Sequence, residues 1–202
     1  MPRIEELSRR IWEDTDFRSK WLIGGLLSTI PLLNIIVLGY FLRYARQLRQ
    51  GGDLTLPAWD NWEELLMDCL RMFILKLVFL GIPFLISLGI SWMLQSVLGI
   101  FSGLTFIPVG WLFLPLGIAA GLIFWMAALM RYLPGQDWAR VFDFAAVWRV
   151  SKRLAPKLAV PVLIFIGLVT VGAPLAGFAF FLGFGPFVAF STAAYLDGTR
   201  AA

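Results

Sequence analysis

The feature that most restricts the fold of this sequence is a run of 38 residues without a charged side chain, residues 158–195. As one straight helix it would be about 57 Å long at ~1.5 Å per residue, almost twice the ~30 Å thickness of a hydrocarbon core. Near its middle, Gly172 and Pro174 predict a break, because proline lacks a backbone N–H and clashes with the preceding turn. We therefore expect two apolar helices, over 158–172 and 175–195.

Three further stretches are apolar over the length of a membrane span, so the sequence predicts an all-α polytopic integral membrane protein with four or five transmembrane helices. Only 15% of the residues are charged, whereas a soluble domain carries about a quarter. The apolar residues run continuously and do not alternate as barrel strands would. A single transmembrane domain is expected over 21–198, after a charged N-terminal segment, 1–20. Its apolar segments are 21–42, 73–98, 107–130, 158–172 and 175–195.

Residues 21–42 are the segment whose path the sequence leaves open between a full span and a re-entrant hairpin. A proline and an asparagine near its middle predict a break. Basic residues in the loops 43–71 and 131–157 place both loops in the cytoplasm, below the cell inner (plasma) membrane. The N-terminal segment carries five basic residues beside five acidic ones, and because the positive-inside rule counts Lys and Arg, we favour the hairpin with both ends cytoplasmic. The candidate hinge or polar intramembrane residues are Pro31, Asn34 and Pro174.

Basic side chains gather beside the apolar segments, where they meet anionic lipid headgroups. The net charge of +4 therefore indicates membrane orientation, and no nucleic-acid partner is expected. The candidate headgroup-binding residues are Arg43, Arg46, Arg49, Arg149, Lys152, Arg153 and Lys157. Small residues at four-residue spacing allow close packing of helices. The candidate helix-packing residues are Gly117, Gly121, Gly185, Ala189 and Ala193.

Two amphipathic helices are expected at the membrane surface between the apolar segments. In the first, within 56–71, Asp60 is predicted to be the N-cap, with a glutamate three residues later as in a capping box. Asp68 is assigned to its polar face, opposite the apolar face that meets the membrane. The second carries an apolar stripe over 138–148, and Asp137 is its predicted N-cap.

The residue types needed for common cofactor and catalytic chemistry are scarce. The sequence has no histidine and a single cysteine, Cys69, which disfavours haem, zinc and copper ligation and excludes an intrachain disulfide. The apolar segments carry almost no ionisable groups, unlike those of proton pumps and coupled transporters. We therefore expect a protein that is not an enzyme and has no cofactor.

The first third of the chain carries a specific pattern: Gly-Gly-Leu-Leu, Ile-Pro, Gly-Tyr and Arg, followed by Gly, Leu-Pro and a segment rich in Trp and Asp. Its residues are Gly24, Gly25, Leu26, Leu27, Ile30, Pro31, Gly39, Tyr40, Arg43, Gly51, Leu56, Pro57, Trp59, Asp60 and Trp62. This pattern resembles the membrane protein family catalogued as domain of unknown function 4013, and residues 128–132 and 149–157 are similar more loosely. The resemblance implies a multi-span bacterial or archaeal membrane protein and no particular activity.

Three functions remain open for such a chain. The first is an accessory, scaffold or assembly subunit of a larger membrane complex, whose partners would be anionic lipids and other membrane protein chains. The second is lipid handling, by a scramblase-like or membrane-shaping protein. The third is a small-solute transporter, which broken helices and an approximate internal repeat favour and the scarcity of polar groups in the spans disfavours.

Overall fold

The structure, a computed structural model, describes residues 9–30, 32–52, 54–102 and 113–200. Within these ranges every regular element is a helix, and four helices are long and apolar enough to cross a membrane. The predicted class, an all-α polytopic membrane protein, is therefore confirmed. The four candidate spans are Trp62–Val97, Phe113–Tyr132, Phe144–Val171 and Ala173–Thr199.

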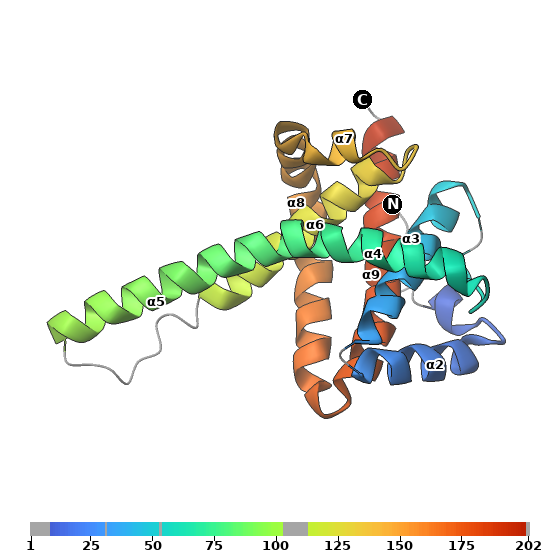
Figure 1. The fold of residues 1–202 in the computed structure, drawn as a ribbon, viewed down its shortest axis with the longest axis horizontal. Coiled ribbons are helices and arrows are strands. Elements are labelled where there is room, and N and C mark those ends of the chain that lie inside the picture. Colours follow the sequence, from blue (N-terminus) through green and yellow to red (C-terminus); the bar gives the residue numbers. More distant parts are fainter. Residues whose placement is uncertain (1–8, 31, 53, 103–112, 201–202) are drawn as a thin grey trace.

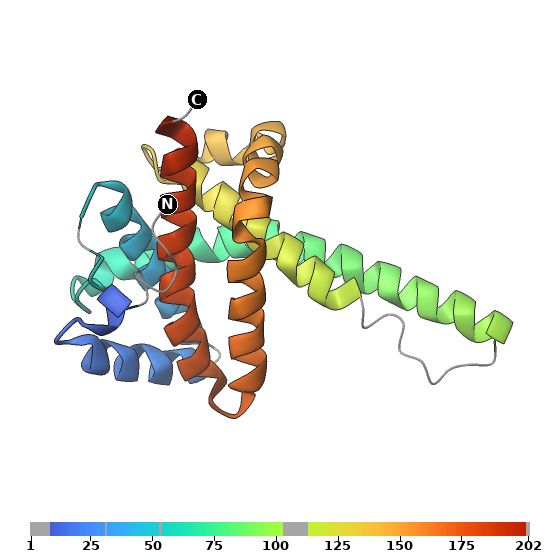
Figure 2. The ribbon, with the colours of Figure 1, turned by 180° about the vertical axis from the view of Figure 1, so that it is seen from behind.

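The long uncharged run forms an antiparallel pair of helices, α8 (Phe144–Val171) and α9 (Ala176–Arg200), which lie side by side in Figure 2. A short 3-10 turn, η3 (Ala173–Leu175), joins them directly after Gly172. The turn contains Pro174, so the chain breaks where the proline removes a backbone donor.

The interpretation of 131–157 as a loop was wrong. Within this segment, a short helix, α7 (Trp138–Phe142), lies directly before α8. The basic residues 149–157 belong to α8 itself. The sequence-based prediction placed the boundary between loop and span directly after these charges. A single long helix can instead carry such charges out of the apolar layer, because its backbone hydrogen bonds are satisfied along its whole length.

Three helical elements continue one another as a single rod, which runs along the chain from α4 (Trp62–Lys76) through a π-helical turn, η1 (Leu77–Gly81), to α5 (Ile82–Ser102). The predicted surface helix and the predicted second span are therefore parts of one element. The π-helical turn lies just before Pro83, whose ring would clash with a carbonyl in a regular α-helical turn.

Aspartates begin two of the helices, and one of these was not expected. Asp137 accepts a hydrogen bond from the Ala139 N–H at 2.9 Å and caps α7, as predicted. Asp143 accepts one from the Ala146 N–H at 3.0 Å and starts α8. The prediction of Asp60 as the N-cap of α4 was wrong, because the cap position is the next residue and makes no side-chain cap.

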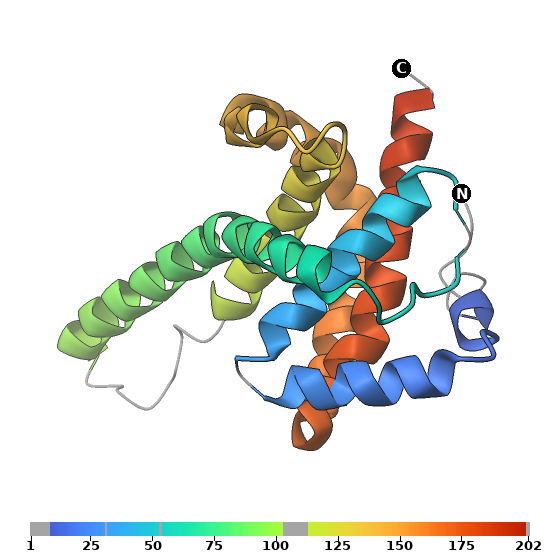
Figure 3. The ribbon, with the colours of Figure 1, turned by 45° about the vertical axis from the view of Figure 1, so that its right-hand side comes forward.

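The rod lies across the α8–α9 pair and not along it (Figures 1 and 3). Helix α6 (Phe113–Tyr132) folds back along α5, and α6 also packs against α8. Helix α5 and the adjoining part of α6 form an arm that protrudes from the rest of the molecule (Figure 1), and we call it the α5–α6 arm. Residues 107–112 of the predicted third span lie outside the described residues.

The first apolar segment is divided into two short helices, α2 (Phe17–Thr29) and α3 (Asn34–Arg49). Neither is among the four candidate spans, and the longer one is about 24 Å at ~1.5 Å per residue. The break therefore lies between residues 30 and 33, and Pro31 itself is outside the described residues. Helix α2 crosses α9, whereas α3 rises beside it (Figure 3).

The start of α2 is tied to the loop before α4. The Lys20 ammonium donates to the Asp14 carboxylate at 2.8 Å and to the Leu56 carbonyl at 2.7 Å. Burial acts to raise the pKa of Asp14, but the hydrogen bonds from Lys20 and the Asp16 N–H and the charge of Lys20 together outweigh it, so this pKa is lower than usual. These contacts hold the residues before α2 against the loop that follows α3.

The core lies where α3, α6, α8 and α9 meet. The Phe184 ring of α9 lies 4.9 Å from Phe41, 5.1 Å from Trp125 and 5.6 Å from Phe165, measured between centroids. These three neighbours come from α3, α6 and α8, and all four rings are buried. Helix α9 therefore packs against α2, α3, α6 and α8.

Candidate functional site

Two groups of basic residues were predicted to bind headgroups. In the structure, the first group makes contacts within the protein, whereas the second is mostly exposed. In the first group, Arg43 donates to the Asp60 carboxylate at 2.7 Å and to the Asp60 carbonyl at 2.8 Å. Arg49 donates to the Met130 carbonyl at 3.1 Å, and its guanidinium lies 5.7 Å from the centroid of the Tyr195 ring. These guanidinium groups are engaged inside the protein.

The third member of this group, Arg46, belongs to a buried ion network between α3 and α4. It donates to Glu64 at 3.1 Å and to Asp68 at 2.9 Å, and Arg71 donates to the same Asp68 oxygen at 3.0 Å. Asp68 is 0% exposed, so its assignment to a water-facing side was wrong. A buried carboxylate requires such partners because an unpaired charge is costly away from water. The α3 arginines are therefore engaged in contacts within the protein, and their headgroup role stays a prediction.

The second group lies along α8 and is more open. Arg149, Lys152 and Arg153 are exposed, whereas Lys157 is half-buried and donates to the Ala194 carbonyl at 3.3 Å. No carboxylate of the described residues lies within ion-pair distance of Arg149 or Lys152. This part of α8 is where the structure leaves positive charge available to a ligand.

Two tyrosines of α3 hold the loop before α4 by its backbone. The Tyr40 hydroxyl donates to the Pro57 carbonyl at 2.8 Å, and the Tyr44 hydroxyl donates to the Leu54 carbonyl at 2.9 Å. Burial raises the pKa of both hydroxyls, so both remain donors at neutral pH. The Trp59 ring stacks on Tyr40 with 4.1 Å between centroids. The Tyr, Pro and Trp of the sequence pattern therefore form one packed contact.

Three glycines of the same pattern, Gly24, Gly25 and Gly39, are positions of close approach. A Cβ on Gly24 would overlap the Phe181 ring, and one on Gly25 would overlap Phe178, so both glycines allow α2 to cross α9. A Cβ on Gly39 would lie 2.6 Å from the Leu65 carbonyl oxygen of α4. These three glycines thus contribute to the packing of α2 against α9 and of α3 against α4.

The predicted packing residues lie at helix contacts in most cases. Gly117 and Gly121 of α6 face Ser87 and Leu80, at the contact with the rod. On α9, Gly185 and Ala189 are buried and Ala193 is half-buried. The Cβ of a residue replacing Gly185 would lie 3.7 Å from Phe41 of α3.

The candidate hinge residues have local roles. The Asn34 amide donates to the Ser28 carbonyl at 3.0 Å and so caps the end of α2 across the break. Pro174 lies in the exposed turn between α8 and α9. Over the part of the chain that the structure describes, no three acidic, cysteine or histidine side chains come together as a metal site would require.

Comparison with known proteins agrees with the pattern. A family model described as "Protein of unknown function (DUF4013)" matches residues 23–193, which is most of the chain. No curated protein and no solved structure matches the chain significantly. The match extends well beyond the first third, where the sequence pattern is most specific.

Proposed function

This chain belongs to the DUF4013 family, and on that premise we propose that it is a non-catalytic integral membrane protein that serves as an accessory or assembly subunit of a larger membrane complex. Several acidic side chains that acid–base chemistry could use are engaged in caps and ion pairs, namely Asp68, Asp137 and Asp143. We place the protein in the inner membrane, with the basic segments 43–71 and 131–157 on the cytoplasmic side.

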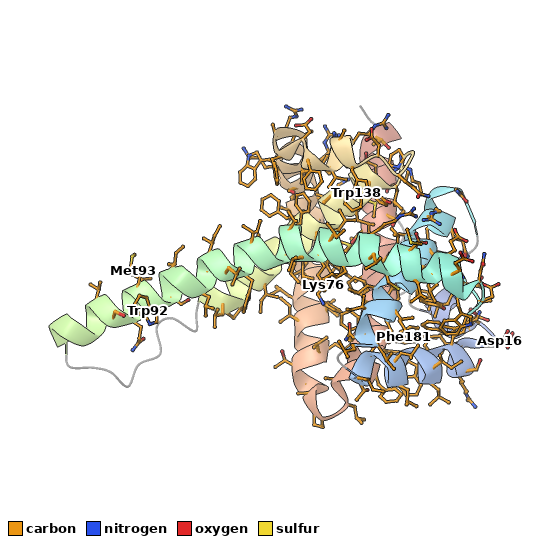
Figure 4. The ribbon with its side chains drawn as sticks, in the orientation of Figure 1. Asp16, Lys76, Trp92, Met93, Trp138 and Phe181 are labelled. Carbon is orange, nitrogen blue, oxygen red and sulfur yellow. The ribbon has the colours of Figure 1, made fainter. Side chains whose placement is uncertain are left out.

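The observation that carries this proposal is the α5–α6 arm. Beyond the π-helical turn, α5 packs mainly against α6, and its other faces are open. The Trp92 and Met93 side chains point away from the rest of the molecule (Figure 4), with exposed fractions of 75% and 55%. The apolar window of the rod is 11% buried, against 28–50% for the other candidate spans.

The open faces of this arm leave room for a neighbouring membrane helix. In lipid, helices associate through close packing and not through the hydrophobic effect, so small residues mark the places where backbones can approach. Gly89 lies on α5, and nothing lies within 4 Å of the position its Cβ would take. The arm therefore offers an open glycine among large apolar side chains, which is the surface that a second membrane protein would cover.

Affinity purification of the full chain in mild detergent tests the proposal. We expect a stoichiometric partner with the wild type and its loss with Gly89→Leu, because the larger side chain holds the partner helix away. Gly167→Leu is the matched control, since Gly167 of α8 is also exposed and has nothing within 4 Å of its Cβ position. A lone monomer, or equal effects of the two substitutions, would contradict the proposal.

Lipid handling is a second candidate function, and the open positive charge of Arg149, Lys152 and Arg153 favours it. In that case purified protein in liposomes would speed the exchange of labelled lipid between leaflets. Exchange no faster than in protein-free liposomes would remove the scramblase version of this function.

A further inference from the structure

An open apolar groove runs between the rod and α6, and its volume is about 450 Å³. Ile82 and Ile86 line one wall, Leu116 and Ala120 line the other, and Ser87 is the one lining residue among those described that carries a polar side chain. The volume falls within the ~300–1,000 Å³ of small-molecule sites. The groove thus suits a long, uncharged, flexible chain.

One end of this groove leads to the positive charge of α8. Phe124, Phe144 and Val147 line that end. Trp148 follows Val147, and its ring stacks on Phe124 with 5.5 Å between centroids. The Lys152 ammonium lies 5.0 Å above the Trp148 ring. A continuous path therefore runs from apolar groove to indole ring to ammonium group.

The charge at this end is available to an anion. Arg149 and Lys152 are exposed and three residues apart on α8, so they lie on neighbouring positions of one helix face. The acid closest to them in sequence, Asp143, lies 3.7 Å from Arg131 and accepts the Ala146 N–H. The two cations are thus unmatched by described carboxylates.

From this geometry we propose that the molecule has a specific binding site for one anionic phospholipid. An acyl chain occupies the groove, and the phosphate group contacts Lys152 and Arg149. A soluble anion would leave the groove unfilled, and an uncharged apolar molecule would leave the two cations unmatched. A phospholipid satisfies both ends at once, and it is present wherever a membrane-spanning chain is.

The two ends of the site contribute different properties. An acyl chain gains no hydrophobic energy when it leaves lipid neighbours for a protein groove, so the groove holds it by close packing alone. The contacts of the phosphate with the cations then decide which headgroup binds. The groove keeps the lipid bound and the cations select it by charge, so both ends of the site are required.

Native mass spectrometry of the full chain tests the site, with palmitoyl-oleoyl phosphatidylglycerol as the probe and the matching phosphatidylcholine as the neutral comparison. We expect a single retained phosphatidylglycerol. Lys152→Gln lowers its affinity about fivefold, as expected for one cation near a phosphate. Ala120→Leu fills the groove and lowers it about tenfold, through loss of roughly ten van der Waals contacts.

Matched controls separate the site from general effects. Arg153→Gln removes an adjacent exposed cation whose side chain lies near Gly198 of α9, and it keeps the bound lipid. Ala159→Leu makes the groove-filling change on an exposed face of α8 and also keeps it. Should Ala120→Leu fail to fold, Ala120→Val gives a smaller loss of affinity. Equal retention of both lipids, or unchanged affinity in the groove variants, would overturn the proposal.

Discussion

At the scale of single residues, the family pattern acts through contacts that leave no room for a side chain. Gly39 of α3 is the sharpest case, because the atoms facing it are the Leu65 carbonyl oxygen at 2.6 Å and the Cys69 nitrogen at 2.7 Å from a Cβ. Both belong to the backbone of α4, which cannot rotate aside as a side chain can. Substitution here must therefore separate the two helices.

We expect Gly39→Ala to destabilise the protein by about 1–3 kcal/mol, the usual cost of overpacking. Gly89→Ala is the control, since Gly89 also lies inside a helix but faces open space. It should be neutral or stabilise by up to about 1 kcal/mol, because alanine loses less backbone entropy on folding. Thermal unfolding in detergent, followed by tryptophan fluorescence, compares them. Equal midpoints for the two variants would contradict this account of Gly39.

Single residues also show which contacts could not be predicted from the sequence. The basic residues at 43 and 46 were recognised, but their acidic partners lie elsewhere in the chain: Asp60 precedes α4, and Glu64 and Asp68 lie on α4. Glu64 and Asp68 are four residues apart on α4 and the arginines recur every three residues on α3, so both sets form helical stripes. That complementarity is visible in the sequence. Helix packing decides which stripe faces water and which faces a neighbouring helix. The pattern within one helix does not determine that packing.

At the scale of helices, the contact of α3 with α4 depends on Asp68. We expect Asp68→Asn to destabilise the protein by about 1.5–3 kcal/mol, because Arg46 and Arg71 both lose a charged hydrogen-bond partner while Arg46 keeps Glu64. Glu63→Gln is the control, an exposed acid on the same helix that should change stability little. Thermal unfolding and limited proteolysis of the loop at 50–61 measure both. A fully stable Asp68→Asn variant would show that the network adds little.

Helix breaks could be predicted from the sequence better than helix continuity. Pro174 removes a donor and disrupts any helix locally, so the turn between α8 and α9 was foreseen. Pro156 and Pro161 lie inside α8 and do not end it, because neighbouring helices support the backbone around them. The direction of the rod across α8 and α9 could not be foreseen, since it results from contacts between distant segments.

At the scale of the whole molecule, the contact of Lys20 with Leu56 bears on the side of the membrane where the N-terminal segment lies. We expect this segment and the loop after α3 to lie on one side, in the cytoplasm. Glu13→Cys and Gln50→Cys, each with Cys69→Ser to remove the native thiol, place labels at exposed positions. An impermeant maleimide should label both in inside-out vesicles and neither in intact cells. Labelling from opposite sides would show that residues 21–42 cross the membrane.

The packing of α2 on α9 also has a consequence for synthesis on the ribosome. Trp21 and Phe178, whose rings are 5.1 Å apart, are separated by 157 residues of chain. At a translation rate of ~5–20 residues per second, about 8–30 s pass between the synthesis of the glycine face of α2 and that of its partner on α9. Until then, the surface made by Gly24 and Gly25 is uncovered. The newborn chain can close this contact only after α9 has been made, so any insertase or protease that meets it earlier meets an unfinished molecule.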